Sequence, residues 1–452
     1  MAATAFAPDV AVTTNQPAVT APTAWPLWQR VLFRFFFVYL LLQITPWYWF
    51  DAIPGVDFVL SAYGKATDWA VALSNARVFH VRETLVPVNG SGDTSYAWTQ
   101  LWLYLSLAVL ACVVWSILDR RRQAYDRMLY WLRLIVRYYL ATFALSYGII
   151  KLFALQMPFP TLSQLATPLG DLLPMRFSWL FIGYSFKYQF FSGLMETTAG
   201  LLLLYRRTVT AGLFAAMGAF LNVVMINLSY DVPVKLFSMH LLFCSCFLLA
   251  LDARRVLGFM VLNVAVPPTQ AYQPRYAWRW QQWGAVAVKL FFVYQILWLP
   301  LKSGWSRYQQ VKAPAAPGPF AAGFYDVRLY VVNHDTIPAA SGDTLRWKDV
   351  IIDNAQAASV NTRDGVFWQR YRRGYFRYKP DTTQRLASVW KISTIPRDST
   401  FLFTMRYEVP DTTVIRFHTR IRDDSIHVEL VRVPRHFQLA ERQFHWLSEY
   451  NR

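Results

Sequence analysis

Apolar residues gather in seven stretches of about 20 residues each, the length that a helix needs to cross the hydrocarbon core of a membrane. The stretches lie near residues 28–50, 98–118, 131–155, 177–205, 208–229, 234–251 and 280–301. This pattern predicts an α-helical polytopic membrane bundle over residues 28–301. Residues 1–27 are rich in Ala, Thr, Pro and Val and lack the basic start of a signal peptide, so they predict a disordered cytoplasmic tail.

The pattern changes from a helical to a period-2 repeat after the last apolar stretch. Between Thr413 and Val433, two arms alternate apolar and polar residues around a turn at Asp423-Asp424-Ser425. Such alternation is typical of half-buried antiparallel strands, and it would make His418 and His427 cross-strand neighbours. We therefore expect a C-terminal β-rich domain over residues 323–452, joined to the bundle by a linker over residues 302–322.

Basic residues in the short loops predict the orientation. Ten arginines lie on one side of the membrane: Arg120, Arg121, Arg122, Arg127, Arg206, Arg207, Arg254, Arg255, Arg275 and Arg279. The opposite loops, 51–97, 156–176 and 230–235, hold few basic residues. By the positive-inside rule the N-terminus is cytoplasmic, and the loop 51–97 and the β-rich domain are extracytoplasmic, which is the arrangement of a bacterial inner-membrane protein.

Charge and cysteine content narrow the classes of function. The chain is 55% hydrophobic and 16% charged, and its net charge is +18. Residues 1–300 carry 22 basic and 12 acidic side chains. Much of this excess of basic residues is explained by the positive-inside rule for loops that stay in the cytoplasm, so it does not require an anionic ligand. No dense basic patch is present, so nucleic acid is excluded as a partner, while the lipid bilayer is implied. All three cysteines fall inside predicted spans, which leaves no disulfide framework outside them.

Ionisable side chains at membrane depth are costly and mark functional sites or structural pairs. Arg34, Arg133 and Arg137 lie near the cytoplasmic ends of their helices, where they can snorkel as anchors. A second group gathers toward the extracytoplasmic side and predicts a polar pocket: Lys151, Lys187, Glu196, Asn222, Asn227 and His240.

Glu196 is the one acidic side chain deep in a predicted span, and it shares a helical face with Gln189, Gly193 and Gly200. Small residues at this spacing let a second helix approach, which places the carboxylate inside the bundle. Three interpretations stay open. Glu196 forms a buried ion pair with Lys151, Lys187 or His240, or it accepts a proton or orients a ligand, or it is a neutral, protonated acid.

Candidate roles follow from this depth analysis. Glu196, Lys151 and His240 are the candidate catalytic residues, with the carboxylate as proton acceptor and the other two as donors. Lys187, Tyr184, Asn222 and Arg206 are the candidate cofactor-binding residues. No metal centre is expected in the spans, because only Cys244 stands near His240 at a helical spacing and a single His/Cys pair is a weak site.

The segments Gly148-Ile149-Ile150-Lys151 and Gly193-Leu194-Met195-Glu196-Thr197-Thr198-Ala199-Gly200, followed by the leucine run and Arg206, resemble the DoxX-like membrane proteins. The resemblance covers about residues 130–255. It implies a four-helix membrane core and, from some members, a link to quinone-coupled sulfur oxidation or quinol oxidase complexes. It marks Lys151, Glu196 and Arg206 as motif positions. An additional N-terminal span, a final span and the β-rich tail extend this chain beyond that core.

Two hypotheses from different classes follow. In the first, the polar pocket binds a quinone or lipid and supports quinone-linked redox chemistry. In the second, the protein is a non-catalytic membrane-assembly or envelope-interaction protein that acts through its β-rich domain, with other membrane subunits as partners. A membrane enzyme with a lysine base and a lumenal β domain, similar in layout to the vitamin K-dependent carboxylases, has no supporting motif, and a transporter lacks visible repeats.

Overall fold

The structure is a computed structural model that describes residues 24–51, 53–267, 272, 274, 276–313, 318–339, 343–392, 400–442 and 444–447. The predicted tail therefore lies almost wholly outside the described residues. The chain divides into two compact units, each described by itself below. Unit 1 holds residues 1–86, 95–136 and 265–275, and unit 2 holds residues 87–94, 137–264 and 276–452.

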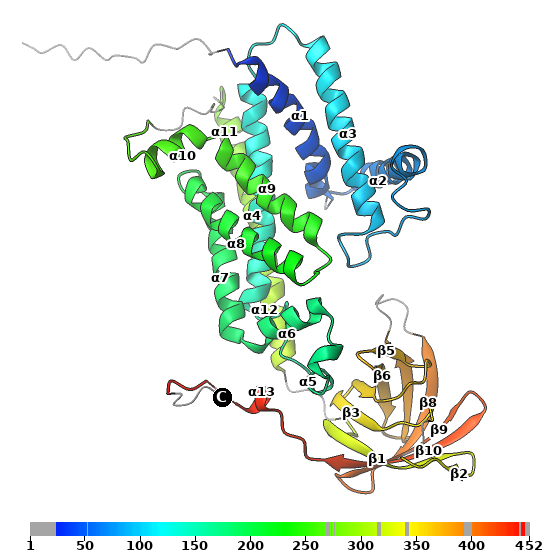
Figure 1. The fold of residues 1–452 in the computed structure, drawn as a ribbon. Coiled ribbons are helices and arrows are strands. Elements are labelled where there is room, and N and C mark those ends of the chain that lie inside the picture. Colours follow the sequence, from blue (N-terminus) through cyan, green and yellow to red (C-terminus); the bar gives the residue numbers. More distant parts are fainter. Residues whose placement is uncertain are drawn as a thin grey trace, which may run out of the picture. The chain divides into compact units, whose positions relative to one another are not determined.

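Unit 1 is built on two apolar helices that pack against each other, α1 (Leu27–Ile44) and α3 (Ser95–Leu118). Helix α1 starts directly after Pro26 and is capped at its C-terminus by Thr45, whose backbone is left-handed. Between them the chain forms η1 (Pro46–Phe50), α2 (Val56–Ser74) and η2 (Asn75–Phe79) (Figure 1). Residues 51–97 were predicted to be a loop, but they contain α2. The apolar residues of α2 are few and are interrupted by polar ones, so the helix does not have the apolar pattern of a membrane span.

Arg34 corrects one detail of the predicted bundle. Its guanidinium, predicted as a snorkelling anchor, is buried by protein within unit 1, where 2% of the residue is exposed. Nε donates to the Tyr125 hydroxyl at 2.9 Å, Nη1 to the Ser116 hydroxyl at 2.8 Å and Nη2 to the Asp119 carbonyl oxygen at 3.0 Å. Three hydrogen bonds satisfy the buried charge, which is the condition under which a protein interior tolerates an arginine.

Helix α4 (Asp126–Leu152) begins in unit 1 and ends in unit 2, which contains the remaining helices. They are α5 (Leu162–Leu165), η3 (Leu169–Asp171), α6 (Pro174–Tyr184), α7 (Phe186–Leu204), α8 (Val209–Ser229), α9 (Lys235–Ala250), α10 (Ala253–Met260), α11 (Arg279–Val293), η4 (Tyr294–Trp298) and α12 (Leu299–Lys312). Because α12 extends to Lys312, residues 302–312 of the predicted linker are helical.

Within the described residues, four helices are long and apolar enough to cross a membrane: α1, α3, α8 and the continuous stretch Arg279–Lys312. A fifth candidate arises if α9 and α10, which are bent by 79°, count as one broken span. The seven predicted spans are therefore not all supported. Helix α4 carries Arg133, Arg137 and Lys151 along its length, and the stretch predicted over 177–205 breaks at Ser185 into α6 and α7.

The C-terminal domain is a closed β-barrel, which confirms and refines the predicted β-rich domain. Eight antiparallel strands follow the order β1-β3-β4-β6-β7-β8-β9-β10, and β10 pairs with β1 to close the barrel (Figure 1). Closure leaves no long unpaired edge strand. The strands are β1 (Gly323–Val332), β2 (Asp335–Thr336), β3 (Asp349–Asn354), β4 (Ala357–Val360), β5 (Trp368–Arg370), β6 (Arg373–Asp381), β7 (Leu386–Lys391), β8 (Phe401–Glu408), β9 (Val414–Ile421) and β10 (Asp424–Val433), and α13 (Gln438–Glu441) follows.

The predicted hairpin is β9 and β10. Its turn residues are Arg422 and Asp423, one position before the predicted centre, because Asp424 already pairs with Ile421. His418 and His427 are cross-strand partners, as predicted, with their Nδ1 atoms 3.0 Å apart.

Aromatic rings fill the barrel interior. The ring of Phe320 lies 5.4, 4.9 and 5.5 Å, between ring centroids, from the rings of Tyr378, Tyr407 and Phe417. Inward side chains of an eight-stranded barrel are expected to pack its interior in this way.

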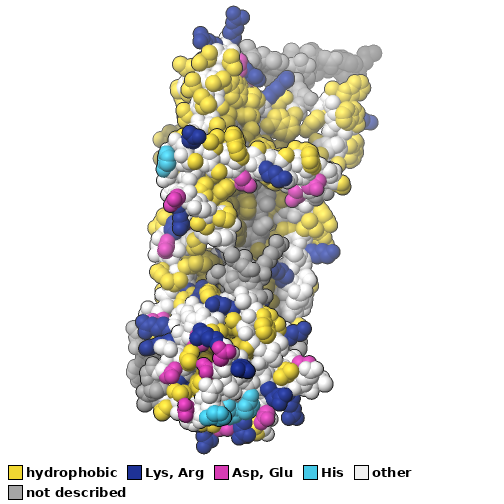
Figure 2. Space-filling view, turned by 90° about the vertical axis from the view of Figure 1, so that its right-hand side faces the viewer, with side chains coloured by type: hydrophobic (Ala, Val, Ile, Leu, Met, Phe, Trp, Pro, Cys, Tyr) yellow, Lys and Arg dark blue, Asp and Glu magenta, His cyan; other side chains and the backbone are white. Residues whose placement is uncertain are grey.

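The surfaces of the helices and of the barrel differ in the type of side chain that they expose. Hydrophobic side chains cover much of the helical part of the face in Figure 2, whereas Lys, Arg, Asp and Glu are closely spaced over the barrel. Large exposed apolar residues occur along the candidate spans, including Leu110 on α3, Leu221 on α8 and Leu290 on α11. Apolar side chains that face outward along long helices are typical of contact with lipid.

Candidate functional site

A buried ion pair joins α4 and α7 within unit 2. Lys151 Nζ donates to Glu196 Oε1, and the two side chains are only 9% and 3% exposed. Lys151 lies in the last turn of α4, and Glu196 lies on the buried face of α7 with Gln189, Gly193 and Gly200. The pair corresponds to the first of the three interpretations of Glu196.

Two glycines bring the helix backbones into direct contact beside the pair. A Cβ added at Gly148 would lie 2.4 Å from Thr197 Oγ1, and one at Gly193 would lie 2.7 Å from the Gly148 carbonyl oxygen. These distances are too short for any side chain, so only glycine fits at either position. The close approach surrounds the charges with backbone and excludes water, which makes the pair a structural link between α4 and α7.

The second carboxylate oxygen of Glu196 is buried and accepts no hydrogen bond from the residues that the structure describes. An oxygen in this state is costly unless a proton or a further donor satisfies it. Neither pocket described below is lined by Lys151, Glu196 or His240. Glu196 Oε2 could therefore accept one more hydrogen bond. A molecule bound in either of these two pockets would not contact the pair.

The other candidate residues are dispersed rather than gathered in one polar pocket. His240 is buried in α9, and its Nδ1 lies 3.2 Å from the Leu236 carbonyl oxygen one turn earlier. Asn222 and Arg206 are exposed. On α8, Asn227 is the buried amide instead, and it donates to the Ser238 hydroxyl at 3.0 Å. Asn222, predicted in the polar pocket, and Arg206, predicted to bind a cofactor, therefore lie on the surface of unit 2.

Tyr184 and Lys187 contact the part of the chain that follows the barrel, residues 434–442 and 444–447, which we call the C-terminal segment. The Tyr184 hydroxyl lies 3.4 Å from the Arg442 carbonyl oxygen, and Lys187 Nζ lies 4.6 Å from the centroid of the Phe444 ring. Both residues were predicted to bind a cofactor, and their contact with this segment was not predicted. A pairing across more than 250 residues leaves no local signal in the sequence.

An apolar pocket of about 310 Å³ opens between α6 and the same C-terminal segment. A pocket of this size falls at the lower end of the range for small-molecule sites. Most of its lining side chains are apolar or aromatic, and its polar groups are Gln164, Thr167, Tyr184 and Gln438. The rest of the lining is Pro160, Leu165, Leu169, Leu172, Phe177, Leu180, Phe181, Phe437 and Leu439.

The wall of this pocket is held by a second buried network, between α5 and the barrel. The Ser163 backbone N–H and hydroxyl donate to Asp353 Oδ1 and Oδ2 at 2.8 and 2.7 Å. The hydroxyl also lies 2.7 Å from that of Ser359, to which Arg373 Nε donates at 3.0 Å. Burial raises the pKa of the Asp353 carboxyl, and the hydrogen bonds from Ser163 offset part of that rise.

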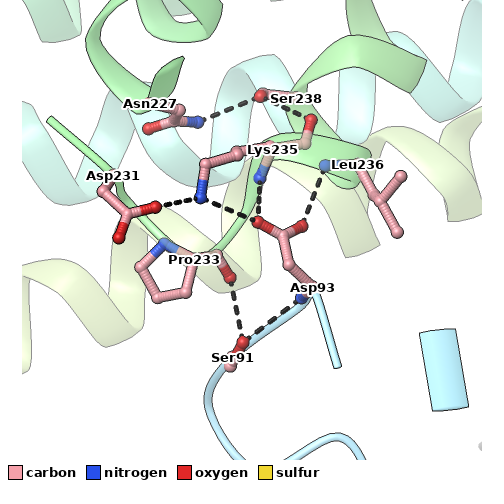
Figure 3. A network of polar contacts seen from close by, with 8 residues as sticks. All are labelled: Ser91, Asp93, Asn227, Asp231, Pro233, Lys235, Leu236 and Ser238. Carbon is pink, nitrogen blue, oxygen red and sulfur yellow. Dashed lines mark hydrogen bonds and ion pairs between the residues drawn. The ribbon is translucent and has the colours of Figure 1, made fainter. Parts of the chain in front are cut away.

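A third network joins the segment before α3 to the start of α9 (Figure 3). The Asp93 carboxylate accepts from the backbone N–H groups of Lys235 and Leu236 at 2.8 and 2.9 Å, so it caps the helix N-terminus. Lys235 Nζ lies 3.7 Å from the same carboxylate and 2.6 Å from that of Asp231. Asp93 thus supplies an N-cap to α9 from a distant part of the chain.

Sequence reasoning missed α5, the C-terminal segment and the two long-range carboxylate contacts. A signal for α5 was present, because Thr161 and Gln164 form a capping box. Among the described residues no group of three or more His, Cys, Asp or Glu side chains is placed to hold a metal ion.

Comparison with known proteins adds one relative. The chain is 37% identical over 81 residues to the Bacillus subtilis (strain 168) protein named "Uncharacterized protein YwoB". The match takes in 18% of this chain, and the chain spans about half (53%) of the length of that relative. No family model matches the chain. No solved structure matches it either.

Proposed function

We propose that the protein is an integral membrane protein that binds one lipid-like or quinone-like molecule in the apolar pocket between α6 and the C-terminal segment. The observation that carries the proposal is the composition of this pocket, in which aliphatic and aromatic side chains form the walls and a few polar groups stand among them. Tyr184, a candidate cofactor-binding residue, is one of those polar groups. An acyl chain or a quinone ring would bury its apolar surface there, while a hydroxyl, amide or carbonyl group orients its polar end.

The Lys151–Glu196 pair takes a positioning role in this proposal. Its residues are two of the motif positions of the DoxX-like resemblance, and they pair with each other. Because they do not line the pocket, we assign them to the packing of α4 against α7 and not to the bound molecule. Quinone-linked redox chemistry is the hypothesis to examine if the bound molecule is a quinone.

The test compares two leucine-to-tryptophan variants of the full chain. The protein is purified in mild detergent, and bound molecules are identified by native mass spectrometry and by organic extraction. Leu180→Trp fills the pocket, whereas Leu194→Trp places the same bulk on an exposed position of α7. We expect one apolar molecule to be retained by the wild type and by Leu194→Trp and to be lost from Leu180→Trp. Retention by all three proteins would overturn the pocket assignment.

A second candidate function is a non-catalytic assembly role for the barrel. The buried network of Ser163, Asp353 and Ser359 favours it, because these contacts fasten the barrel to α5 and so hold it at one end of the helices. An empty pocket in the wild type after gentle purification, together with an intact fold, would favour this function over ligand binding.

We further propose that the membrane is the bacterial inner membrane, with a cytoplasmic N-terminus and an extracytoplasmic barrel. The ten arginines that gather in the loops on one side of the predicted spans support this orientation. Single cysteines introduced at the exposed residues Arg206 and Asp326, in a variant whose three native cysteines are replaced by alanine, provide the test. A membrane-impermeant maleimide applied to whole spheroplasts is expected to label the cysteine at 326 and not the one at 206; the reverse pattern would invert the topology.

A further inference from the structure

Unit 1 contains a pocket of a different chemical character from the apolar one. It has a volume of about 210 Å³ and lies where α1 ends, α2 passes and α3 begins. Its lining is Leu42, Gln43, Thr45, Tyr48, Tyr63, Gly64, Thr67, Asp68, Tyr96, Gln100 and Tyr104. Four of these eleven residues are tyrosines, and Asp68 is the one charged residue among them.

Helical spacing explains why these side chains converge. Tyr63, Thr67 and their neighbours Gly64 and Asp68 form one face of α2, at intervals of four residues. Tyr96, Gln100 and Tyr104 form one face of α3 at the same interval. The pocket is thus built by two regular helix faces and the end of α1.

Internal hydrogen bonds hold the polar lining in place. The Tyr96 hydroxyl donates to Asp68 Oδ1 at 2.6 Å, and Gln100 Nε2 donates to the Tyr104 hydroxyl at 3.1 Å. Gln43 Oε1 is buried and, within the described part of the chain, has no donor. The lining therefore combines one carboxylate, one unused amide acceptor and several aromatic rings.

This combination selects against anions and favours a cation that carries N–H donors. No Lys or Arg side chain lines the pocket, so a phosphate or carboxylate would meet Asp68 with no compensating charge. An ammonium group would gain from the carboxylate, from the unused acceptor and from the negative faces of tyrosine rings. We propose that this pocket binds the primary ammonium group of a small amine or of an ethanolamine lipid headgroup.

The position of the pocket fits either source of the ammonium group. Helix α1 ends at Ile44 and α3 begins at Ser95, so two candidate spans reach their ends beside the pocket. The ends of spans lie at the depth of lipid headgroups. The opposite face of α2 exposes Phe58 and Trp69, which suits a helix that lies against the membrane surface.

Binding of a free amine is tested with the full chain in nanodiscs of phosphatidylglycerol, which has no ammonium group. Ethanolamine is titrated as the probe, with glycerol as a neutral molecule of similar size, and the midpoint of thermal unfolding is measured. We expect a saturable rise with ethanolamine and none with glycerol. Asp68→Asn is expected to weaken the response about tenfold. An equal response to glycerol, or an unchanged response in Asp68→Asn, would overturn the proposal.

A pair of glycine variants controls for the fold. A Cβ at Gly64 would enter the pocket with only the Tyr48 hydroxyl near it, at 3.6 Å, whereas a Cβ at Gly218 on α8 meets no atom within 4 Å. Gly64→Leu is expected to abolish ethanolamine binding and Gly218→Leu to preserve it. If Gly64→Leu does not fold, Asp68→Asn and Tyr96→Phe provide the test of ethanolamine binding. Each variant removes one partner of the hydrogen bond between the Tyr96 hydroxyl and the Asp68 carboxylate.

The lipid source is tested in nanodiscs that mix phosphatidylethanolamine with phosphatidylglycerol. Native mass spectrometry after partial delipidation is expected to show preferential retention of phosphatidylethanolamine by the wild type and its loss in Asp68→Asn, if the headgroup is the ligand. Ethanolamine binding without this preference would assign the site to a free amine. Absence of both results would overturn the proposal.

Discussion

Ser163 and Asp353 form a two-point contact between a four-residue helix and a barrel strand. The backbone N–H and the hydroxyl of Ser163 each donate to one oxygen of the Asp353 carboxylate, at 2.8 and 2.7 Å. Ser163 is completely buried, so neither donor has access to water. The barrel and the helix α5 are therefore held by a contact whose loss would leave the buried Ser163 N–H without an acceptor.

Replacement of Asp353 is expected to destabilise the protein, because the Ser163 N–H loses its acceptor and the Ser163 hydroxyl keeps only the Ser359 hydroxyl as a partner. Asp353→Ala should lower the free energy of unfolding by about 1–3 kcal/mol, the range for an unsatisfied buried polar group. The midpoint of thermal unfolding of the detergent-solubilised chain measures the effect. Asp326→Ala, at an exposed position of β1, is the matched control and should leave the midpoint unchanged. Equal midpoints for both variants would show that the contact contributes nothing.

The Lys151–Glu196 pair is expected to show strong coupling in a double-mutant cycle. Lys151→Met and Glu196→Gln should each cost about 3–5 kcal/mol, because each leaves the partner group buried without its counter-charge. The double variant should cost less than the sum of the two. Lys289→Met, at an exposed lysine on α11, serves as the control for lost charge alone. Simple additivity would contradict the structural role of the pair.

The contact of α4 with α7 depends on Gly193. Gly193→Ala places a methyl group 2.7 Å from the Gly148 carbonyl oxygen and from the Leu152 nitrogen, so the helices must separate. We expect a loss of about 1–3 kcal/mol, measured by thermal unfolding. Gly218→Ala, where a Cβ meets no atom within 4 Å, should keep or raise the midpoint because alanine is the better helix former. A similar loss in both variants would rule out the close approach as the cause.

The His418–His427 pair predicts a dependence of stability on pH. Burial, followed by repulsion from His418, lowers the pKa of His427. The unfolded chain then takes up a proton more readily than the folded one, so stability is lost as the pH falls through the ordinary histidine value of about 6.5. Arg416 opposes protonation further, whereas Glu408 and Glu429 favour it.

The measurement compares unfolding midpoints of the wild type and His427→Gln from about pH 8 to about pH 5, the range in which histidine titrates. We expect the wild-type midpoint to fall more steeply over this range than that of the variant. Arg420→Gln, at an exposed position on the paired strand β9, controls for lost surface charge. Parallel curves for wild type and His427→Gln would refute the assignment.

The extent to which sequence predicted this structure depends on how local each signal is. The hairpin of β9 and β10 follows from strict alternation, because burial on one face of a strand has a period of two residues. The face of Glu196 follows from glycines at helical spacing. Both predictions use residues close together in the chain, and both the hairpin pairing and the close approach of α4 to α7 are found.

Long-range contacts escaped prediction for the opposite reason. Asp353 is an ordinary polar residue near a strand end until Ser163, 190 positions away, is placed beside it. The break in the fourth predicted span was also missed, although Ser185 carries a local signal. Its hydroxyl accepts from the Tyr188 backbone N–H at 3.2 Å and caps α7, which favours a new helix start over a continuous span.

Asp93 provides a further test of a long-range contact, since it caps α9 from outside that helix. Asp93→Ala should leave the Lys235 and Leu236 N–H groups without their acceptors and cost about 1 kcal/mol, with faster hydrogen exchange of the first turn of α9. Asp231→Ala removes only an ion pair whose carboxylate side chain is 82% exposed, and such pairs contribute little. The exchange rates of residues 235–238 therefore separate the two roles of the acidic residues around Lys235. If both variants change those rates equally, the cap is not what holds the start of α9, and the ion pair with Asp231 takes that role.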